Sequence, residues 1–227
     1  MNLQIIKNGY LECDKGMVTL GRDMGKKIKI PVYCYLLKHK KGNVLIDTGF
    51  SKDFKNTWGK RLNFYSPILE TDIPNELKTT KIDFIINTHL HIDHCENNSK
   101  FKDATIITQK KEFESAKNPP VYQKLAYPDK IDENLNYKII DGKFDIFDDK
   151  KILIIPTEGH TSGHQSVLLD TDEGNVFIAG DACYTQENLK YNCLPGILWS
   201  PDKIVENYEM IRNLKDTKII FGHEEIN

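Results

Sequence analysis

The stretch T-H-L-H-I-D-H-C-E-N-N, residues 88–98, holds three of the seven histidines in a chain of 227 residues. Its candidate ligands are His89, His91, Asp93 and His94. The apolar run over residues 82–87 predicts a buried strand that ends at this cluster. On an extended chain His89 and His91 share a face, and Asp93 and His94 would follow in a turn or a first helical turn. Because Zn²⁺ and similar ions bind imidazole and carboxylate groups, the stretch predicts a metal site rather than a polar surface loop.

Three further candidate ligands also stand just beyond predicted strands. His160 follows the run K-I-L-I-I-P-T, Asp181 ends N-V-F-I-A-G-D, and His223 follows K-I-I-F-G. A single histidine or aspartate in such a place is often only a cap or turn residue. The recurrence at three strand ends favours one shared site.

Strand-like runs alternate with fewer helical stretches along the whole chain. Residues 31–37 and 44–47 read as a hairpin, and residues 110–117 and about 202–214 read as helices. There is no repeat, linker or low-complexity tract, so residues 1–227 are predicted to form a single domain. This pattern predicts an α/β fold with two packed sheets.

Two apolar stretches could border the site. Phe50, Phe54, Trp58 and Leu62 recur every four residues, before Phe64 and Tyr65, and the second stretch is L-P-G-I-L-W, residues 194–199. The first predicts an amphipathic helix, packed either on the core or over the site. The second reads as a pocket wall or a buried loop.

The composition bears on partners and compartment. A net charge of −2 shows no surplus of Lys and Arg for binding nucleic acid. No apolar run approaches the length of a membrane span. The five cysteines are odd in number and include no Cys-x-x-Cys pair, so we expect no disulfide framework and a reducing cytoplasm. Neither a membrane nor a nucleic acid is an expected partner, and a homodimer stays open.

The ordered motifs resemble the metallo-β-lactamase superfamily: His-x-His-x-Asp-His at 89–94, Gly-His-Thr-x-Gly-His at 159–164, a lone aspartate, and a late Gly-His. The resemblance implies an αββα sandwich of two mixed β-sheets flanked by helices, with two divalent metal ions at one edge. Zinc is the first expectation, with iron, manganese and cobalt open. By position, His89, His91 and His160 would hold one metal, Asp93, His94 and His223 the other, and Asp181 would bridge them.

Two more residues match the superfamily pattern outside the ligand set. Asp47, in L-I-D-T-G, corresponds to an early aspartate that lies behind the ligands, although a plain turn aspartate is the alternative. His164 closes the second motif, and we expect it to support the ligands rather than bind metal.

The chemistry follows from a two-metal site. A water between two cations loses a proton near neutral pH and becomes a nucleophile, and the same cations polarise the carbonyl that it attacks. The site therefore predicts hydrolysis of an ester, lactone, thioester or amide, and the fold alone does not choose among them.

Three stretches resemble the N-acyl-homoserine lactonases, which are quorum-quenching enzymes: P-V-Y-C-Y-L-L, L-N-Y-K-I-I-D-G and G-D-A-C-Y-T-Q-E-N-L. In that family a tyrosine three residues after the bridging aspartate assists the substrate carbonyl. Here it is Tyr184, for which packing in the core is the alternative. The resemblance also implies that Asp93 moves the proton to the leaving group. The expected substrate is then a small-molecule lactone or ester.

The sequence departs from the superfamily after His94, where small residues and glycines are usual and Cys95-Glu96-Asn97-Asn98 stands instead. Glu96 would face solvent or crowd the second metal. The main alternative activity is that of a glyoxalase-II-like thioesterase, which shares the metal motifs but favours basic residues near an anionic thiol carrier. No such set is evident. A nuclease conflicts with the net charge, and di-iron oxygen reductases tend to replace one clustered histidine by a carboxylate.

Overall fold

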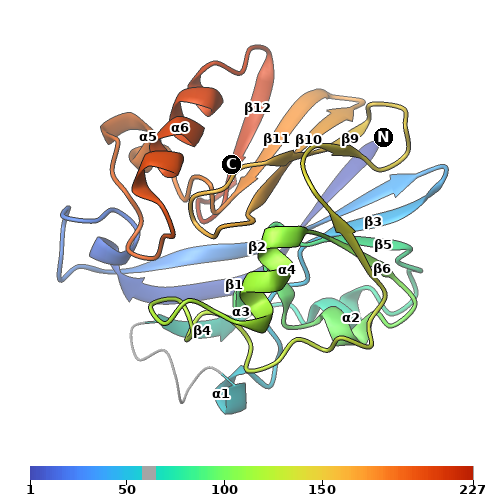
Figure 1. Ribbon diagram of the computed structural model, residues 1–227, viewed down its shortest axis with the longest axis horizontal. Helices are drawn as coiled ribbons and strands as arrows, with labels where there is room; N and C mark the ends of the chain where they lie inside the picture. The colour runs from blue at the N-terminus through green and yellow to red at the C-terminus, as the bar shows by residue number, and fades with distance from the viewer. Residues whose placement is uncertain (58–64, 227) are drawn as a thin grey trace.

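The computed structural model describes residues 1–57 and 65–226, and its strands form two sheets (Figure 1). The larger sheet has the order β4-β1-β2-β3-β5-β6-β7 and the smaller one β12-β11-β10-β9-β8. The larger sheet consists of β1 (Asn2–Asp14), β2 (Lys27–His39), β3 (Gly42–Ile46), β4 (Tyr65–Leu69), β5 (Phe84–Ile86), β6 (Thr105–Gln109) and β7 (Tyr137–Ile140). The smaller sheet consists of β8 (Phe144–Asp145), β9 (Ile152–Pro156), β10 (Gln165–Thr171), β11 (Gly174–Gly180) and β12 (Thr217–Phe221).

The core between the sheets follows from the alternation of side chains along each strand. On β3, Val44 and Ile46 join the central core, whereas Leu45 joins the cluster on the outer face. On β11, Ile178 points inward and Phe177 outward. Each sheet therefore buries both faces, and each outer face needs a cover of helices.

Helices supply that cover on both sides, as Figure 1 shows with α5 and α6 beyond the smaller sheet and α2 and α4 beyond the larger. The helices are α1 (Phe54–Thr57), α2 (Ile73–Glu76), α3 (Ile92–Cys95), α4 (Lys110–Lys117), α5 (Gln186–Tyr191) and α6 (Pro201–Arg212). On α6, Ile204, Tyr208 and Ile211 pack against the outer face of β11. The expected αββα sandwich is confirmed.

The sheet order brings the candidate ligands together. Strands β11 and β12 are parallel neighbours with Gly180 opposite Phe221, so Asp181 and His223 leave the smaller sheet side by side. Strand β5 of the larger sheet ends three residues before His89. The loops after these strands meet at one edge of the sandwich.

Some local predictions differ from the structure. The expected helix from Phe50 is limited to α1 among the described residues, because Phe50 itself is buried in a loop. Trp58, Leu62 and Phe64 lie outside the described residues. Strands β1 and β4 and helix α5 had not been predicted. Strand β1 contains a bulge between Lys7 and Gly9 that interrupts its alternation.

Two expectations from the sequence concern disulfide bonds and membrane-spanning helices. All five cysteines are free, which confirms the absence of a disulfide framework. No helix within residues 1–57 and 65–226 has the length and apolar character that crossing a membrane requires.

Candidate metal centre

The loop after β5 and helix α3 carry four of the candidate ligands within six residues. His91 has extended backbone angles and is the N-cap of α3, so the chain changes from strand to helix at this residue. Asp93 and His94 then lie in the first turn, where the His94 side chain lies near His89 and Asp181, and Asp93 lies near His94 and His223. All four are buried, and Asp93 at 8 % exposure is the most exposed of them.

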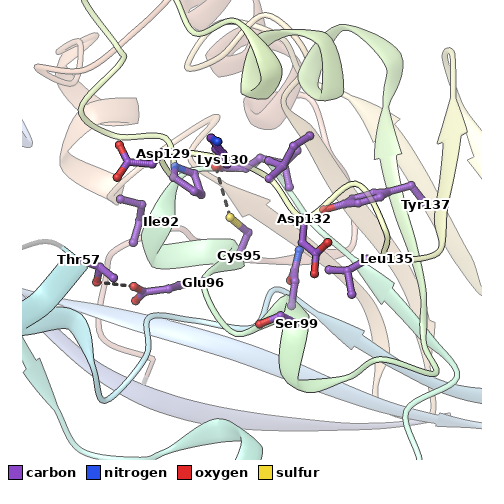
Figure 2. Close-up of a pocket in the computed structure, with 14 residues that line it drawn as sticks. Thr57, Ile92, Cys95, Glu96, Ser99, Asp129, Lys130, Asp132, Leu135 and Tyr137 are labelled. Atoms are coloured by element: carbon purple, nitrogen blue, oxygen red, sulfur yellow. Dashed lines mark hydrogen bonds between the residues drawn. The ribbon is translucent and has the colours of Figure 1, made fainter.

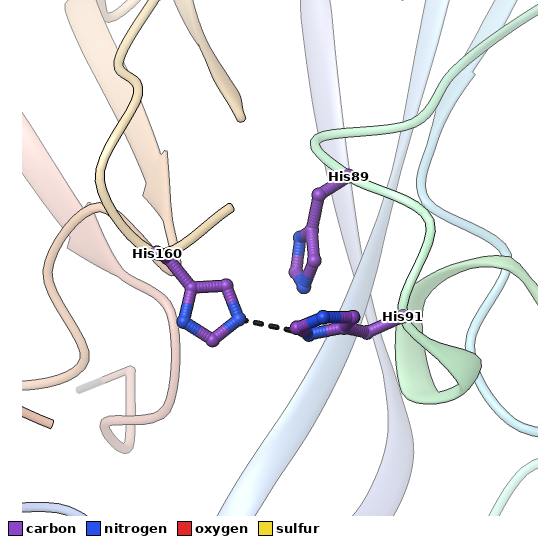
Figure 3. Close-up of side chains that lie close together, drawn as sticks. All are labelled: His89, His91 and His160. Atoms are coloured by element: carbon purple, nitrogen blue, oxygen red, sulfur yellow. Dashed lines mark hydrogen bonds between the residues drawn. The ribbon is translucent and has the colours of Figure 1, made fainter. Parts of the chain in front are cut away.

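All seven predicted ligands meet at this edge in three overlapping groups. Within each group one ligand atom of every residue lies within 4.8 Å of the others. The groups are His89, His91 and His160; His89, His94 and Asp181; and Asp93, His94 and His223. Figure 3 shows the first group, in which the His160 ring faces His91 across two loops.

Asp181 lies between the histidine groups and faces both. Its Oδ2 is 3.8 Å from His89 Nε2 and 3.3 Å from His160 Nε2. Its Oδ1 is 3.4 Å from His94 Nε2 and 3.3 Å from His223 Nε2. One carboxylate thus directs a different oxygen to each half of the site.

The donor set fits divalent cations. Among the described residues, four buried polar atoms at this point have no hydrogen-bond partner: Nε2 of His89, His91 and His94, and Oδ1 of Asp181. A buried polar atom left unpaired costs about 1–3 kcal/mol. Four of them converging from two segments of the chain match the nitrogen and oxygen ligands that zinc and related ions take.

Hydrogen bonds from Nδ1 on the far side of three rings turn Nε2 towards the centre. His94 Nδ1 donates to Asp47 Oδ2 at 2.8 Å, and His160 Nδ1 donates to the Ile197 carbonyl at 2.9 Å. His223 Nδ1 donates to the Pro31 carbonyl at 2.9 Å. These contacts hold the rings in the orientation that a metal ligand needs.

The electrostatics differ between the two halves. Burial lowers the pKa of His89, His91 and His160, which favours neutral imidazoles. Burial alone would also lower the pKa of His94 and His223, but Asp181 and Asp93 outweigh it and raise both. Burial would raise the pKa of Asp181, and the facing histidines hold it well below its usual value.

Asp47 and His164 lie directly behind the ligands. Asp47 accepts hydrogen bonds from the Thr88 amide and hydroxyl at 2.7 and 2.8 Å, besides the bond from His94. Its φ of 56° is in the left-handed region, which an aspartate tolerates better than most residues. His164 Nε2 accepts from the Asp181 amide at 2.9 Å, and burial lowers the pKa of this ring to about 3.

Tyr184 lies at the wall of the cleft that opens over the ligands. Its ring centroid is 4.9 Å from that of His223 and 5.6 Å from that of His160, and its hydroxyl bonds to Asp181. Burial raises the pKa of this phenol well above its usual value, so it keeps its proton. Of the apolar stretches noted in the sequence, Tyr65 and Ile197 line the same cleft.

Glu96 is partly exposed, as the solvent-facing alternative expects, and belongs to none of the ligand groups. Its carboxylate accepts hydrogen bonds from the Ser51 amide at 2.7 Å and from the Thr57 hydroxyl, and Figure 2 shows the second of these. It therefore fixes the loop after Gly49. A cavity of about 450 Å³ adjoins it, lined among others by Ile92, Cys95 and Leu135.

Sequence reasoning missed two buried side chains that contact the ligand loops. Glu112 on α4 accepts from the Leu90 amide, and Gln123 Nε2 donates to the His160 carbonyl at 2.7 Å. The spacing of Glu112 and Ala116, both buried on one helix face, is the only local signal for the first. Gln123 lies in a turn and has none.

Comparison with known proteins supports this fold. The metallo-beta-lactamase superfamily model matches residues 29–223, and the chain belongs to that superfamily. N-acyl homoserine lactonase AiiA of Bacillus thuringiensis subsp. kurstaki is 32% identical over 98% of this chain and 92% of its own length. N-acyl homoserine lactonase AttM of Azorhizobium caulinodans is 27% identical over 99% of this chain and 93% of its own length.

Solved structures give the same grouping. A structure of an N-acyl homoserine lactone hydrolase with the product N-hexanoyl-L-homoserine at its catalytic metal centre has a TM-score of 0.85 and 30% identity, and covers 97% of this chain and 92% of its own. Within the superfamily, the chain belongs with the N-acyl homoserine lactonases.

Proposed function

We propose that this protein is a metal-dependent hydrolase that opens the lactone ring of N-acyl homoserine lactones. The observation that carries the proposal is the position of Asp181, whose two oxygens face two separate histidine groups. The likeness to lactonases over almost the whole chain supports the choice of substrate.

The proposed ligand set has two parts that share one carboxylate. His89, His91 and His160 hold one divalent ion, and Asp93, His94 and His223 hold the other, with Asp181 between them. Asp47 and His164 keep His94 and Asp181 in place. The nitrogen-rich donor set favours zinc. When bound, two such ions lower the pKa of water and polarise a substrate carbonyl.

The chain's own side chains complete the reaction. Tyr184 keeps its proton and donates a hydrogen bond to the carbonyl oxygen of the lactone as negative charge develops on it. Asp93, on α3 beside the cleft, transfers a proton to the ring oxygen that leaves when the C–O bond breaks. Water adds to the carbonyl carbon, and the product is the open-chain hydroxy acid.

Apolar residues around the cleft suit the acyl chain of such a substrate. Leu11, Ile30, Tyr65 and Ile197 line it opposite the ligands. Each methylene that they remove from water contributes about 0.8 kcal/mol. We propose that residues 1–227 act as one domain on this small molecule, without nucleic acid, and that the five free cysteines suit the cytoplasm.

Proton release tests the activity directly. Adding N-hexanoyl homoserine lactone to zinc-loaded protein at neutral pH should release one proton for each ring opened. Asp93→Asn keeps the shape of the side chain and removes both its proton transfer and its charge towards the second ion, so its zinc content is measured alongside its activity. Absence of release for all acyl lengths, together with cleavage of a glutathione thioester, would instead establish a thioesterase.

Metal content tests the site without a substrate. Protein purified without chelator and supplied with zinc should contain two ions per chain by elemental analysis. A reproducible value of one in folded protein would contradict the two-part ligand set.

A further inference from the structure

The loop that carries His89 and His91 and the loop that carries His160 meet at a buried carboxylate on helix α4. Glu112 of α4 has no measurable solvent exposure. Its Oε1 accepts the Leu90 amide at 2.8 Å, and Leu90 stands between His89 and His91. Its Oε2 accepts the Thr161 hydroxyl at 2.5 Å, and Thr161 follows His160. A single carboxylate thus bonds both ligand loops.

Two further contacts strengthen this arrangement. Tyr127 donates its hydroxyl to Glu112 Oε1 at 3.1 Å, and the Tyr127 ring packs edge-on against His91 with centroids 4.6 Å apart. The Gly163 amide also bonds to the carboxylate. Every group around Glu112 donates, which is the environment that an ionised carboxylate satisfies and an amide does not.

The backbone of the His160 loop touches α4 so closely that no side chain fits between them. A Cβ on Gly163 would lie 2.1 Å from the Glu112 amide nitrogen. The Ser115 and Ser162 hydroxyls, 2.8 Å apart, add a second bond between the same helix and loop. The separation of the His89–His91 loop from the His160 loop is therefore set through α4.

We propose that Glu112 is a positioning residue, which fixes the distance between the His89–His91 loop and the His160 loop and so assembles the three-histidine metal site. It touches neither the ligand atoms nor the substrate cleft. The inference rests on the proposed function to the extent that these histidines hold an ion. Outer partners of metal ligands typically contribute 10–100-fold in metal affinity.

Glu112→Gln tests this role, with Glu114→Gln on the exposed face of the same helix as the matched control. One orientation of the new amide sets its NH₂ group against the Leu90 amide, and the other removes the acceptor for Thr161. Competition for Zn²⁺ with a coloured chelator should show one of two sites weakened about 10–100-fold in Glu112→Gln. Both sites should be unchanged in Glu114→Gln.

Activity supplies a second readout that separates positioning from general damage. At high Zn²⁺ the Glu112→Gln variant should recover kcat to within about threefold, while the Zn²⁺ concentration for half-maximal activity rises by the same factor as the affinity falls. A lower melting temperature of the metal-free variant with both zinc affinities within about threefold of wild type would overturn the proposal.

Thr161→Val provides a milder variant if Glu112→Gln does not fold. It removes one donor to the carboxylate and keeps the shape of the side chain, and we expect a loss of about threefold to tenfold at one zinc site. Unchanged affinity in this variant would also count against the proposal. If wild-type protein binds no zinc at all, the proposed function fails instead, so the two failures are distinguishable.

Discussion

The two halves of the metal centre are held in different ways. Around His89, His91 and His160 the supporting side chains Glu112 and Gln123 are buried, and the Ile197 carbonyl is partly buried. In the other half His223 bonds to the Pro31 carbonyl and His94 to Asp47, both in the interior, but the segment that follows His223 is held at the surface. Glu225, two residues further on, accepts from Lys7 Nζ at 2.9 Å, Tyr10 at 2.7 Å and Tyr33 at 2.8 Å, and its side chain is 48% exposed.

The two halves of the metal centre also differ in their charges. The three-histidine half contains neutral rings whose pKa is lowered by burial, whereas the other half includes carboxylates that raise the pKa of His94 and His223. Charged contacts near solvent are weakened by salt and water, and buried hydrogen bonds are not. We therefore expect substitution of the buried supporting groups to lower zinc affinity sharply and substitution of the exposed Glu225 to have a gradual effect.

Removing the shared carboxylate should have the largest effect because it serves both halves. Asp181→Asn keeps the shape of the side chain and loses the charge that faces His160 on one oxygen and His223 on the other. Since partners outside the ligand set already contribute 10–100-fold, kcat/KM should fall by more than about 10²-fold and both zinc affinities should drop. Loss of zinc affinity at one site alone would mean that Asp181 is a ligand of that site only.

Single histidine variants should separate the halves. His91→Ala and His223→Ala should each retain one zinc per chain, and the double variant should retain none. We expect His91→Ala to lose more zinc affinity at its own site than His223→Ala loses at the other site. The reason is that the remaining ligands of the three-histidine site stay fixed around an incomplete set. Elemental analysis and chelator competition measure both quantities. A single variant that loses both ions would show that the halves assemble only together.

The sequence predicted the ligands because each stands where a strand ends. Strand periodicity located those ends, and the scarcity of histidine made their coincidence informative. The order of the strands then brought Asp181 beside His223 through the parallel pair β11 and β12. Such residues are predictable because local pattern and topology agree.

Glu112 could not be predicted in the same way. A glutamate in the first turn of a helix is ordinarily a favourable surface charge near the positive end of the helix dipole. Only its contacts with Leu90 and Thr161, 22 and 49 residues away in sequence, make it a buried acceptor. Strand β1 was missed because its alternation is interrupted at the Lys7–Gly9 bulge.

Tyr184 lies at the boundary of the halves, with its ring near both His160 and His223. Tyr184→Phe removes one hydroxyl and almost no volume, so zinc content should not change. Because bound metals would share the stabilisation of the oxyanion, we expect kcat/KM to fall about tenfold, or about 1.4 kcal/mol.

Tyr208→Phe is the control for the loss of a buried hydroxyl. Tyr208 lies on α6, outside the ligand set, and its hydroxyl donates to the Cys193 carbonyl at 2.9 Å. It should lower the melting temperature and leave turnover unchanged. Wild-type kcat/KM in Tyr184→Phe would assign the polarisation of the carbonyl to the metals alone.

The smallest effect is expected at Glu225, which holds the segment after His223 at the surface. Lys7 and two tyrosines lower the pKa of this carboxyl from its usual 4.5. A lowered folded-state pKa means that the stabilisation is complete above about pH 4.5 and is lost as the pH falls through the folded value.

At pH 7, Glu225→Gln should cost the metal-free protein on the order of 1 kcal/mol, or about 2–4 °C in melting temperature. The difference from wild type should shrink below pH 4.5, whereas the control Glu209→Gln, exposed on α6, should show none at any pH. A loss of zinc affinity in Glu225→Gln as large as that in Glu112→Gln would remove the asymmetry between the two halves, because surface and buried support would then be equivalent.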